Sequence, residues 1–270
     1  MNIKLIDHHM HTQASPDADP NLTKEQYIEK AMELNLPGVL FTDHVDFDFF
    51  QPIFHHLIDY DVYEKNIEHL KKIYPIDILM GVEIGYQKHL NQRMDDFLKK
   101  HQFDFVICST HMCDGLDLYN GDFFKGKTQQ ESYQRYFENV LYNVENYDNY
   151  DVYGHIDYII RYGGFEVRDY DYELYKDIID KILMKIIENH KGIELNTSGI
   201  RYGLGVTHPK FEVIKRFKEL GGKYITLGSD AHYLKDFQNN FKLGLKLLKE
   251  AGFTYVTQYK NRKPYQVKIA

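Results

Sequence analysis

Short apolar runs alternate with amphipathic segments along the whole chain. The apolar runs have the length of buried strands, and the segments between them show the three- and four-residue spacing of helices. One helical segment begins with Thr23-Lys-Glu-Gln26, the pattern of a capping box. We predict strands over residues 4–11, 38–44, 76–86, 103–112, 152–158, 192–198 and 224–232. We predict helices over residues 23–35, 60–74, 88–101, 129–147, 171–190, 209–220 and 236–250.

Seven strand–helix units in succession favour a parallel sheet with crossover helices. Closed on itself, such a sheet is a seven-stranded relative of the eight-fold β/α barrel, and an open doubly wound sheet is the alternative. No GxGxxG or GxxxxGK[ST] run follows any predicted strand, so the nucleotide-binding version has no support. We therefore predict an α/β fold, a (β/α)7 barrel that forms a single domain over residues 1–270.

Histidines gather at one end of the predicted strands. The chain has 14 histidines, and several lie at the carboxyl end of a predicted strand, where β/α barrels build active sites. Any one histidine is more often a core or surface residue than a ligand, but the joint placement indicates a metal site. These residues are His9, His11, His44, His111, His155 and His232.

The local spacing adds geometry to this set. Side chains alternate along a strand, so Asp7, His9 and His11 are predicted to share one face and His8 to point away. Asp230 and His232 are related in the same way. Imidazoles mixed with carboxylates, without thiolates, suit zinc, manganese or iron in a catalytic site.

Glu83 is the lone charge in an apolar strand between Gly81 and Gly85. A buried carboxylate without a partner is costly, so Glu83 needs a cation or hydrogen-bond donors. The small flanking glycines leave room on its face. We therefore expect Glu83 to belong to the metal site.

Charge and composition narrow the class of protein. The formal net charge is −7, whereas proteins that bind nucleic acid through phosphates usually have a basic surface. No apolar run reaches the roughly 18 residues of a membrane span, and the chain shows no signal-peptide core. Cys108 and Cys113 have neither metal-site nor disulfide spacing and are expected to be reduced. We expect a cytoplasmic protein with no nucleic-acid or membrane partner.

The ordered set of motifs resembles the polymerase and histidinol phosphatase (PHP) family, and in particular its stand-alone histidinol-phosphate phosphatases. The resemblance covers nearly the whole chain and implies a distorted (β/α)7 barrel with three divalent metal ions. The matching motifs are Asp7-x-His9-x-His11, Thr42-Asp43-His44, Gly81-Val-Glu83, Ser109-Thr-His111, Gly154-His155, Asn196-Thr-Ser-Gly199 and Gly228-Ser-Asp230-Ala-His232.

The resemblance also implies how the ligands are shared. His9, His11, Glu83 and Asp230 would hold the first ion, and Glu83 would bridge to a second ion. His111 and His155 would complete the second position. His44 and His232 would hold a third ion together with Asp17, where many relatives have histidine. An oxygen donor at that place changes which metal is preferred.

Phosphate chemistry suggests further roles. Arg161 and Arg201 follow the fifth and sixth strands, and guanidinium groups match phosphate oxygens; in the resembling phosphatases, arginines in such loops bind the substrate phosphate. Asn196 is a candidate substrate contact, with a polar core network as the alternative. A hydroxide that bridges two metals is expected to attack phosphorus in line. The candidate catalytic groups near the third ion are His44, His232 and Asp17, and the general acid stays unassigned.

The resemblance implies a phosphomonoesterase that hydrolyses L-histidinol phosphate in histidine biosynthesis. Alternatives in the same family are a phosphodiesterase or nuclease and a phosphotyrosine phosphatase, and a non-catalytic metal-binding module is the alternative from another class. The aromatic loop over residues 45–60 is either a lid or rim packing. The tail over residues 253–270 is a hairpin, a rim strand or a partner contact, and the oligomeric state is not predicted.

Overall fold

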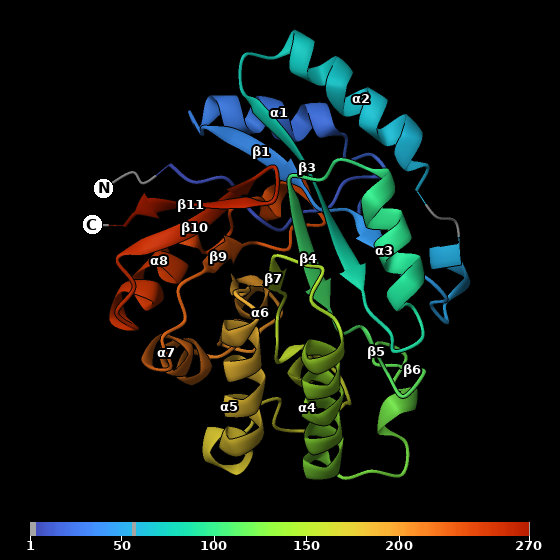
Figure 1. Cartoon of the computed structure of the whole chain (residues 1–270), viewed down its shortest axis with the longest axis vertical. Coiled ribbons are helices and arrows are strands. Elements are labelled where there is room, and N and C mark those ends of the chain that lie inside the picture. Colours follow the sequence, from blue (N-terminus) through green and yellow to red (C-terminus); the bar gives the residue numbers. More distant parts are fainter. Residues whose placement is uncertain (1–3, 56–57, 270) are drawn as a thin grey trace.

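A parallel sheet curls through the centre of the molecule, and helices cover its outer side (Figure 1). The structure is a computed structural model that describes residues 4–55 and 58–269. The sheet order is β1-β3-β4-β7-β8-β9, with β2 beside β3, and every pairing is parallel. The strands are β1 (Gly38–Phe41), β2 (His44–Val45), β3 (Asp77–Gly85), β4 (Phe105–Ser109), β7 (Val152–Tyr153), β8 (Gly192–Asn196) and β9 (Ile225–Gly228).

The N-terminal segment closes this sheet into a barrel. Residues 4–11 form no regular strand, contrary to prediction, yet they run between the two edge strands. The amide of Thr42 donates to the carbonyl of Met10 (3.0 Å), and the amide of His8 donates to the carbonyl of Leu227 (3.2 Å). These bonds join the β1 edge to the β9 edge. The predicted distorted (β/α)7 barrel is therefore confirmed, with the irregular segment 4–11 in the place of one regular strand.

All seven predicted helices are present, with their ends shifted by a few residues. In α1, the side chain of Thr23 accepts from the amide of Gln26, and the side chain of Gln26 accepts from the amide of Thr23, as the capping-box pattern predicts. The helices are α1 (Lys24–Glu33), α2 (Tyr60–Ile73), α3 (Asn91–Lys100), α4 (Gln129–Asn146), α5 (Tyr172–Glu188), α7 (Phe211–Glu219) and α8 (Phe241–Glu250). The short α6 (Ser198–Arg201) was not predicted.

A C-terminal hairpin fills the amino-terminal end of the barrel, opposite the carboxyl ends of the strands. It consists of β10 (Tyr255–Lys260) and β11 (Lys263–Lys268), which pair antiparallel. The Tyr259 side chain is buried in an apolar cluster inside the barrel, and its amide donates to His8 Nε2 at 2.9 Å. The tail is thus a hairpin. The other members of that cluster are Ile6, Leu40, Leu79, Phe105, Ile107 and Val152.

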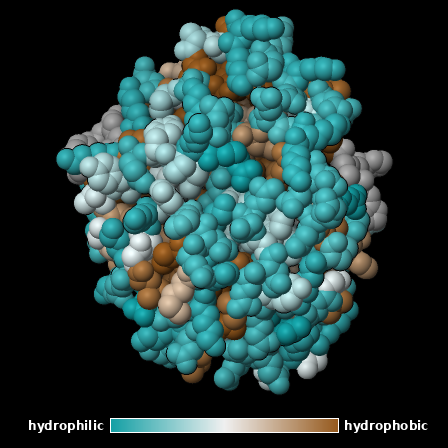
Figure 2. All heavy atoms as spheres, viewed as in Figure 1, coloured by the Kyte–Doolittle hydropathy of each residue, from teal (hydrophilic) through white to brown (hydrophobic). Residues whose placement is uncertain are grey.

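Short irregular elements surround the opposite end. A two-stranded ribbon of β5 (Met112–Cys113) and β6 (Leu116–Asp117) follows β4, and four 3-10 turns lie in other loops. Figure 2 shows a mainly hydrophilic face with scattered hydrophobic side chains. Within the described residues, every helix is too short or too polar to cross a membrane.

Candidate metal centre

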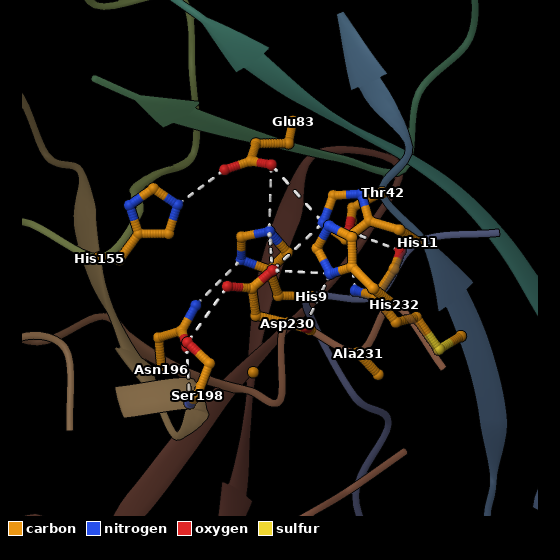
Figure 3. Close-up of polar contacts among 12 residues, drawn as sticks. His9, His11, Thr42, Glu83, His155, Asn196, Ser198, Asp230, Ala231 and His232 are labelled. Atoms are coloured by element: carbon orange, nitrogen blue, oxygen red, sulfur yellow. Dashed lines mark hydrogen bonds and ion pairs between the residues drawn. The ribbon is translucent and has the colours of Figure 1, made fainter. Parts of the chain in front are cut away.

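The nine predicted ligand residues converge at the carboxyl end of the barrel strands. They come from the N-terminal segment, from β2 and β3, and from the loops after β4, β7 and β9. Figure 3 shows several of their side chains pointing toward one another, with the carboxylate of Glu83 among the imidazoles. Segments far apart in the sequence therefore build one compact cluster.

One group of donor atoms forms around one oxygen of Glu83. His9 Nε2 lies 3.2 Å and His11 Nε2 lies 3.6 Å from Glu83 Oε2. The same two imidazole nitrogens lie 3.7 Å and 3.4 Å from Asp230 Oδ1. Two imidazoles and two carboxylates thus enclose one point, which is a suitable set for a divalent transition metal.

The second oxygen of Glu83 faces two further imidazoles. Glu83 Oε1 lies 2.9 Å from His155 Nε2 and 3.2 Å from His111 Nε2. His44 Nδ1 approaches the first oxygen at 2.9 Å. One carboxylate is therefore shared between two groups of potential ligands.

A third group lies toward the rim of the barrel. Asp17 Oδ2 lies 3.2 Å from His232 Nε2 and 3.6 Å from His44 Nε2. The rings of His44 and His232 each lie 4.2 Å from the ring of His11, measured between centroids. Nitrogen atoms of these three histidines lie within 4.8 Å of one another, which is close enough to share an ion.

Unsatisfied atoms test whether metals fit here. His9 Nε2, His11 Nε2, His44 Nδ1 and Glu83 Oε2 are buried and make no hydrogen bond in the structure. Each such atom costs free energy unless a partner satisfies it, and all four point into the cluster. Divalent metal ions would supply the missing partner, so these residues fit a metal centre.

Burial and mutual charge shift the pKa values of the cluster. Burial disfavours the imidazolium of His9, but the carboxylates of Glu194 and Glu83 outweigh it and hold the pKa of His9 well above its usual value. Burial would raise the pKa of Glu83, yet nearby imidazoles, led by those of His9 and His111, hold it well below the usual value. The cluster therefore keeps its carboxylates ionised, as metal ligation requires.

Several of these imidazoles also have a polar partner at the ring nitrogen that faces away from the cluster. His111 Nδ1 pairs with Asp46 Oδ1 at 2.7 Å, and His11 Nδ1 lies 3.2 Å from Ser15 Oγ. Such partners fix the tautomer and orientation of a ligating imidazole. Asp46 was not among the predicted site residues, because a single carboxylate two residues after His44 carries no distinctive signal.

The predicted alternation at the N-terminus was wrong in part. Asp7 does not share the metal-facing side: its carboxylate accepts from the amide and hydroxyl of Ser229 and from the amide of Gln238. His8 is buried against the ring of Phe105, 5.1 Å away between centroids, inside the amino-terminal end of the barrel. A bend at residues 8–9 breaks the period of two and places consecutive histidines inside the barrel.

A cavity of about 300 Å³ opens over the cluster. Its walls combine metal-facing groups with aromatic rings and two further carboxylates, Asp46 and Asp117. The 45–60 loop contributes both to packing and to this wall: Phe47 is buried, whereas Phe49 and Phe54 line the cavity. Gln51 Nε2 of that loop donates to Asp117 Oδ2 at 2.7 Å. The size and lining suit a small molecule that has polar and aromatic parts.

The two predicted phosphate-binding arginines lie in different surroundings. Arg161 lines the cavity, and its guanidinium donates to Ser198 Oγ (2.6 Å) and Asp230 Oδ2 (3.3 Å). Arg201 does not line the cavity. It donates instead to the carbonyl oxygens of Ser229 (3.0 Å) and Asp230 (2.7 Å). These two hydrogen bonds hold the loop after β9 in place.

Asn196 is fully buried and takes part in a polar network. Its side-chain amide donates to Glu194 Oε2 (3.1 Å), and its side-chain oxygen accepts from the amide of Ser198 (2.9 Å). It does not line the cavity. This arrangement favours the polar network, which was the alternative to a direct substrate contact.

Comparison with known proteins agrees with this geometry. A model of the PHP domain matches residues 7–198. A probable histidinol-phosphatase of Clostridium acetobutylicum is 32% identical over 90% of this chain and 92% of its own length. A histidinol-phosphatase of Lactococcus lactis is 29% identical over 97% of this chain and 96% of its own.

A solved structure extends the likeness to the fold. The histidinol phosphate phosphatase of Lactococcus lactis, crystallised with zinc, L-histidinol and phosphate, superimposes with a TM-score of 0.86 at 28% identity. The alignment covers 97% of this chain and 99% of that one. The matched domain, the barrel and the clustered ligands together show that this chain belongs to the PHP family.

Proposed function

We propose that this chain is a metal-dependent phosphomonoesterase that hydrolyses L-histidinol phosphate to L-histidinol and phosphate, a step of histidine biosynthesis. The observation that carries the proposal is the buried cluster of unpaired imidazole and carboxylate atoms at the base of an aromatic cavity. The near-full-length likeness to histidinol-phosphatases, one of them crystallised with zinc, L-histidinol and phosphate, supports the choice of substrate.

Three metal positions follow from the three groups of donor atoms. We assign His9, His11, Glu83 and Asp230 to the first position, and Glu83, His111 and His155 to the second. The third takes Asp17, His44 and His232. Zinc, manganese and iron all accept such ligands, and zinc is the metal in the related crystal structure. When bound, these ions neutralise phosphate charge and generate the nucleophile from water at neutral pH.

Three side chains have further roles in phosphate binding and in support of the metal ligands. Arg161 presents a guanidinium to the cavity, where it can bind phosphate oxygens as charge builds up in the transition state. Asp230 accepts from Arg161 and thereby sets its direction. Arg201 holds the backbone of Ser229 and Asp230, so we place it in support of the metal ligands.

The cavity walls suit the organic part of the substrate. L-histidinol has an amine and an imidazole, which can each be cationic. Asp46 and Asp117 bring carboxylates to the wall, and aromatic rings such as those of Phe54 and Tyr119 offer faces for a planar heterocycle. A simple aryl phosphate lacks the cationic groups. We therefore expect it to be a weaker substrate.

We further propose that the chain acts as one catalytic domain in the cytoplasm, on a small molecule and not on nucleic acid. The proposed ligand set draws on both ends of the chain, since the rings of His11 and His232 lie 4.2 Å apart between centroids, which supports a single domain. Both cysteines, Cys108 and Cys113, are free thiols, which suits a reducing compartment.

Phosphate release tests this proposal. Protein loaded with zinc or manganese is assayed on L-histidinol phosphate beside an aryl phosphate, phosphotyrosine and a phosphodiester. We expect kcat/KM for L-histidinol phosphate to exceed the others by at least about 100-fold, because among them only that ester brings both an amine and an imidazole to the carboxylates and rings of the wall. Preference for phosphotyrosine or the diester would reject the substrate and retain the metal site.

A further inference from the structure

We propose that Glu194 is a positioning residue for the metal centre: its single carboxylate orients ligands of two metal positions at once. This inference rests on the metal positions of the proposed function. Glu194 lies in β8, on the barrel side opposite Glu83, and belongs to none of the three groups of ligands.

The contacts of Glu194 carry the inference. Its side chain is fully buried, and Oε1 lies 2.7 Å from His9 Nδ1. The other oxygen, Oε2, accepts from the backbone amide of His155 at 3.1 Å. His9 belongs to the first metal position and His155 to the second. One carboxylate is thus bonded to both residues.

The geometry defines which nitrogen of His9 remains free. The oxygen of Glu194 is the acceptor in this pair, so His9 Nδ1 donates to it. Nε2 is then the nitrogen left for an ion, and it faces Glu83 and Asp230, where the first ion would sit. A partner that fixes the tautomer in this way also raises the basicity of the ligating nitrogen.

The sequence reserves the space that Glu194 needs. A Cβ atom at Gly228 would stand 2.3 Å from Glu194 Oε1 and 2.5 Å from His9 Cβ. Any residue other than glycine at position 228 would therefore push the carboxylate and the imidazole apart. Asn196 completes the arrangement by donating to Oε2 at 3.1 Å.

A purely structural role is the competing explanation, because Glu194 also links the β7 and β8 ends. The two explanations predict different effects for Glu194→Gln. A glutamine keeps the volume but has only one acceptor oxygen, so it cannot serve both His9 Nδ1–H and the amide of His155. Metal affinity should fall even where the metal-free fold remains.

The experiment is a metal titration of metal-free protein, without substrate. Zinc or manganese is titrated against a chromophoric chelator into the wild type, Glu194→Gln and Glu194→Ala. Thermal unfolding of each metal-free protein is measured in parallel. Asp104→Asn is the matched control, since Asp104 is a buried carboxylate at the other end of the barrel that bonds the amides of Met80 and Asn261.

We expect Glu194→Gln to weaken at least one metal-binding step by about 10- to 100-fold, and Glu194→Ala to weaken it further. Asp104→Asn should bind metal as the wild type does, whatever its unfolding temperature. In Glu194→Gln reloaded at high metal concentration, kcat should recover toward the wild type.

Two results would overturn the inference. One is wild-type affinity at every step in Glu194→Gln, and the other is a loss of affinity in all variants, the control included, in proportion to lost stability. Because the titration uses no ester, it is independent of the substrate. Wild-type protein that binds metal but ignores L-histidinol phosphate would reject the proposed function alone.

Discussion

Arg161 is the residue whose surroundings bear most directly on phosphate recognition. Its guanidinium lies between the rings of Tyr158 and Tyr202, 4.6 Å and 4.1 Å from their centroids. Burial and these contacts hold its planar group in place while its Nε lacks a partner. A preorganised cation of this kind stabilises developing charge without further rearrangement.

Replacing Arg161 with alanine should lower kcat/KM for L-histidinol phosphate by about 10²- to 10³-fold, as loss of one preorganised donor does in other enzymes. Steady-state kinetics on metal-loaded protein gives the value. Arg216→Ala is the control, because Arg216 pairs with Asp180 on the outer helices. A change below about threefold in the Arg161 variant would remove it from phosphate binding.

The Asp46–His111 pair makes the metal-free protein sensitive to pH. Burial disfavours the imidazolium of His111, but Asp46 and Glu83 outweigh it and raise its pKa to about 10. Burial likewise opposes the charge of Asp46, and His111 lowers the pKa of that carboxyl to about 2. The stabilisation from His111 is thus fully present below its unfolded value of 6.5 and fades as pH rises through about 10.

Metal binding has the opposite dependence, since the ligand imidazoles must release protons. Between about pH 6.5 and 9, the difference in unfolding temperature between metal-loaded and metal-free protein should therefore widen. The contribution of Asp46 is constant over this range, because it is lost only as pH falls from 3.8 through about 2. Calorimetry of both forms measures the difference, and a gap that narrows with pH would contradict the expectation.

At this scale the sequence identified the clustered residues better than the partners that hold them. His9 and His111 are recognisable because imidazoles at strand ends are unusual and fall at one edge of a parallel sheet. Glu194 and Asp46 hold those imidazoles, but a carboxylate two residues along a strand has no distinctive pattern. The direction of Arg201 was also beyond reach, since loop side chains choose among partners that only the fold brings near.

At the scale of elements, local signals fixed the helices well. The capping box of α1 forms as predicted, with Thr23 Oγ1 accepting from the amide of Gln26 at 3.3 Å. The buried face of α5 is narrower than its set of apolar residues: Ile179 and Ile182 are buried, while Leu174 is 61% exposed at the first turn. Periodicity identifies a helix more reliably than it identifies the ends of its buried face.

Replacing Thr23 with alanine should destabilise the protein by about 1 kcal/mol and lower its unfolding temperature by about 2–4 °C. Thr23→Ser keeps the capping oxygen and should stay close to the wild type. Phosphatase kinetics at 25 °C should be the same in all three proteins, because the cap lies outside the metal cluster. Equal stability of the alanine and serine variants would show that the cap contributes nothing.

The strands were predicted less exactly, for a reason that concerns function. Regular pairing stops early in β7 (Val152–Tyr153) and is absent from residues 4–11. Both segments supply proposed ligands, His155 from one and the pair His9 and His11 from the other. Turning these side chains toward a common centre requires departures from strand geometry, which a pattern of period two cannot show.

At the scale of the whole molecule, the two ends of the barrel have separate tasks. The carboxyl end holds the charged cluster, and the other end is an apolar core sealed by the hairpin. The ring of Tyr259 packs 4.9 Å from that of Phe105, between centroids. Stability and chemistry are therefore located apart, as in other β/α barrels.

Replacing Tyr259 with alanine should cost about 3–5 kcal/mol of stability, the range for a large aromatic residue removed from a core. Metal content and KM at low temperature should be retained, because the cavity lies at the other end. Tyr265→Ala on the same hairpin is the control, since that side chain is 40% exposed. Loss of metal in folded Tyr259→Ala protein would show that the two ends are coupled.

The seam of the barrel, where residues 4–11 meet β9 and the loop that follows it, also sets the order of events during synthesis. The matched PHP domain ends at residue 198, yet Asp230 and His232 belong to the proposed ligand set and lie beyond it. The carbonyl of His9 receives the amide of Asp230 across the seam. A nascent chain thus presents its first histidines to the ribosome exit long before their partners are translated. For the first and third proposed positions, which include Asp230 and His232, we therefore expect a metal ion to bind only after the barrel has closed.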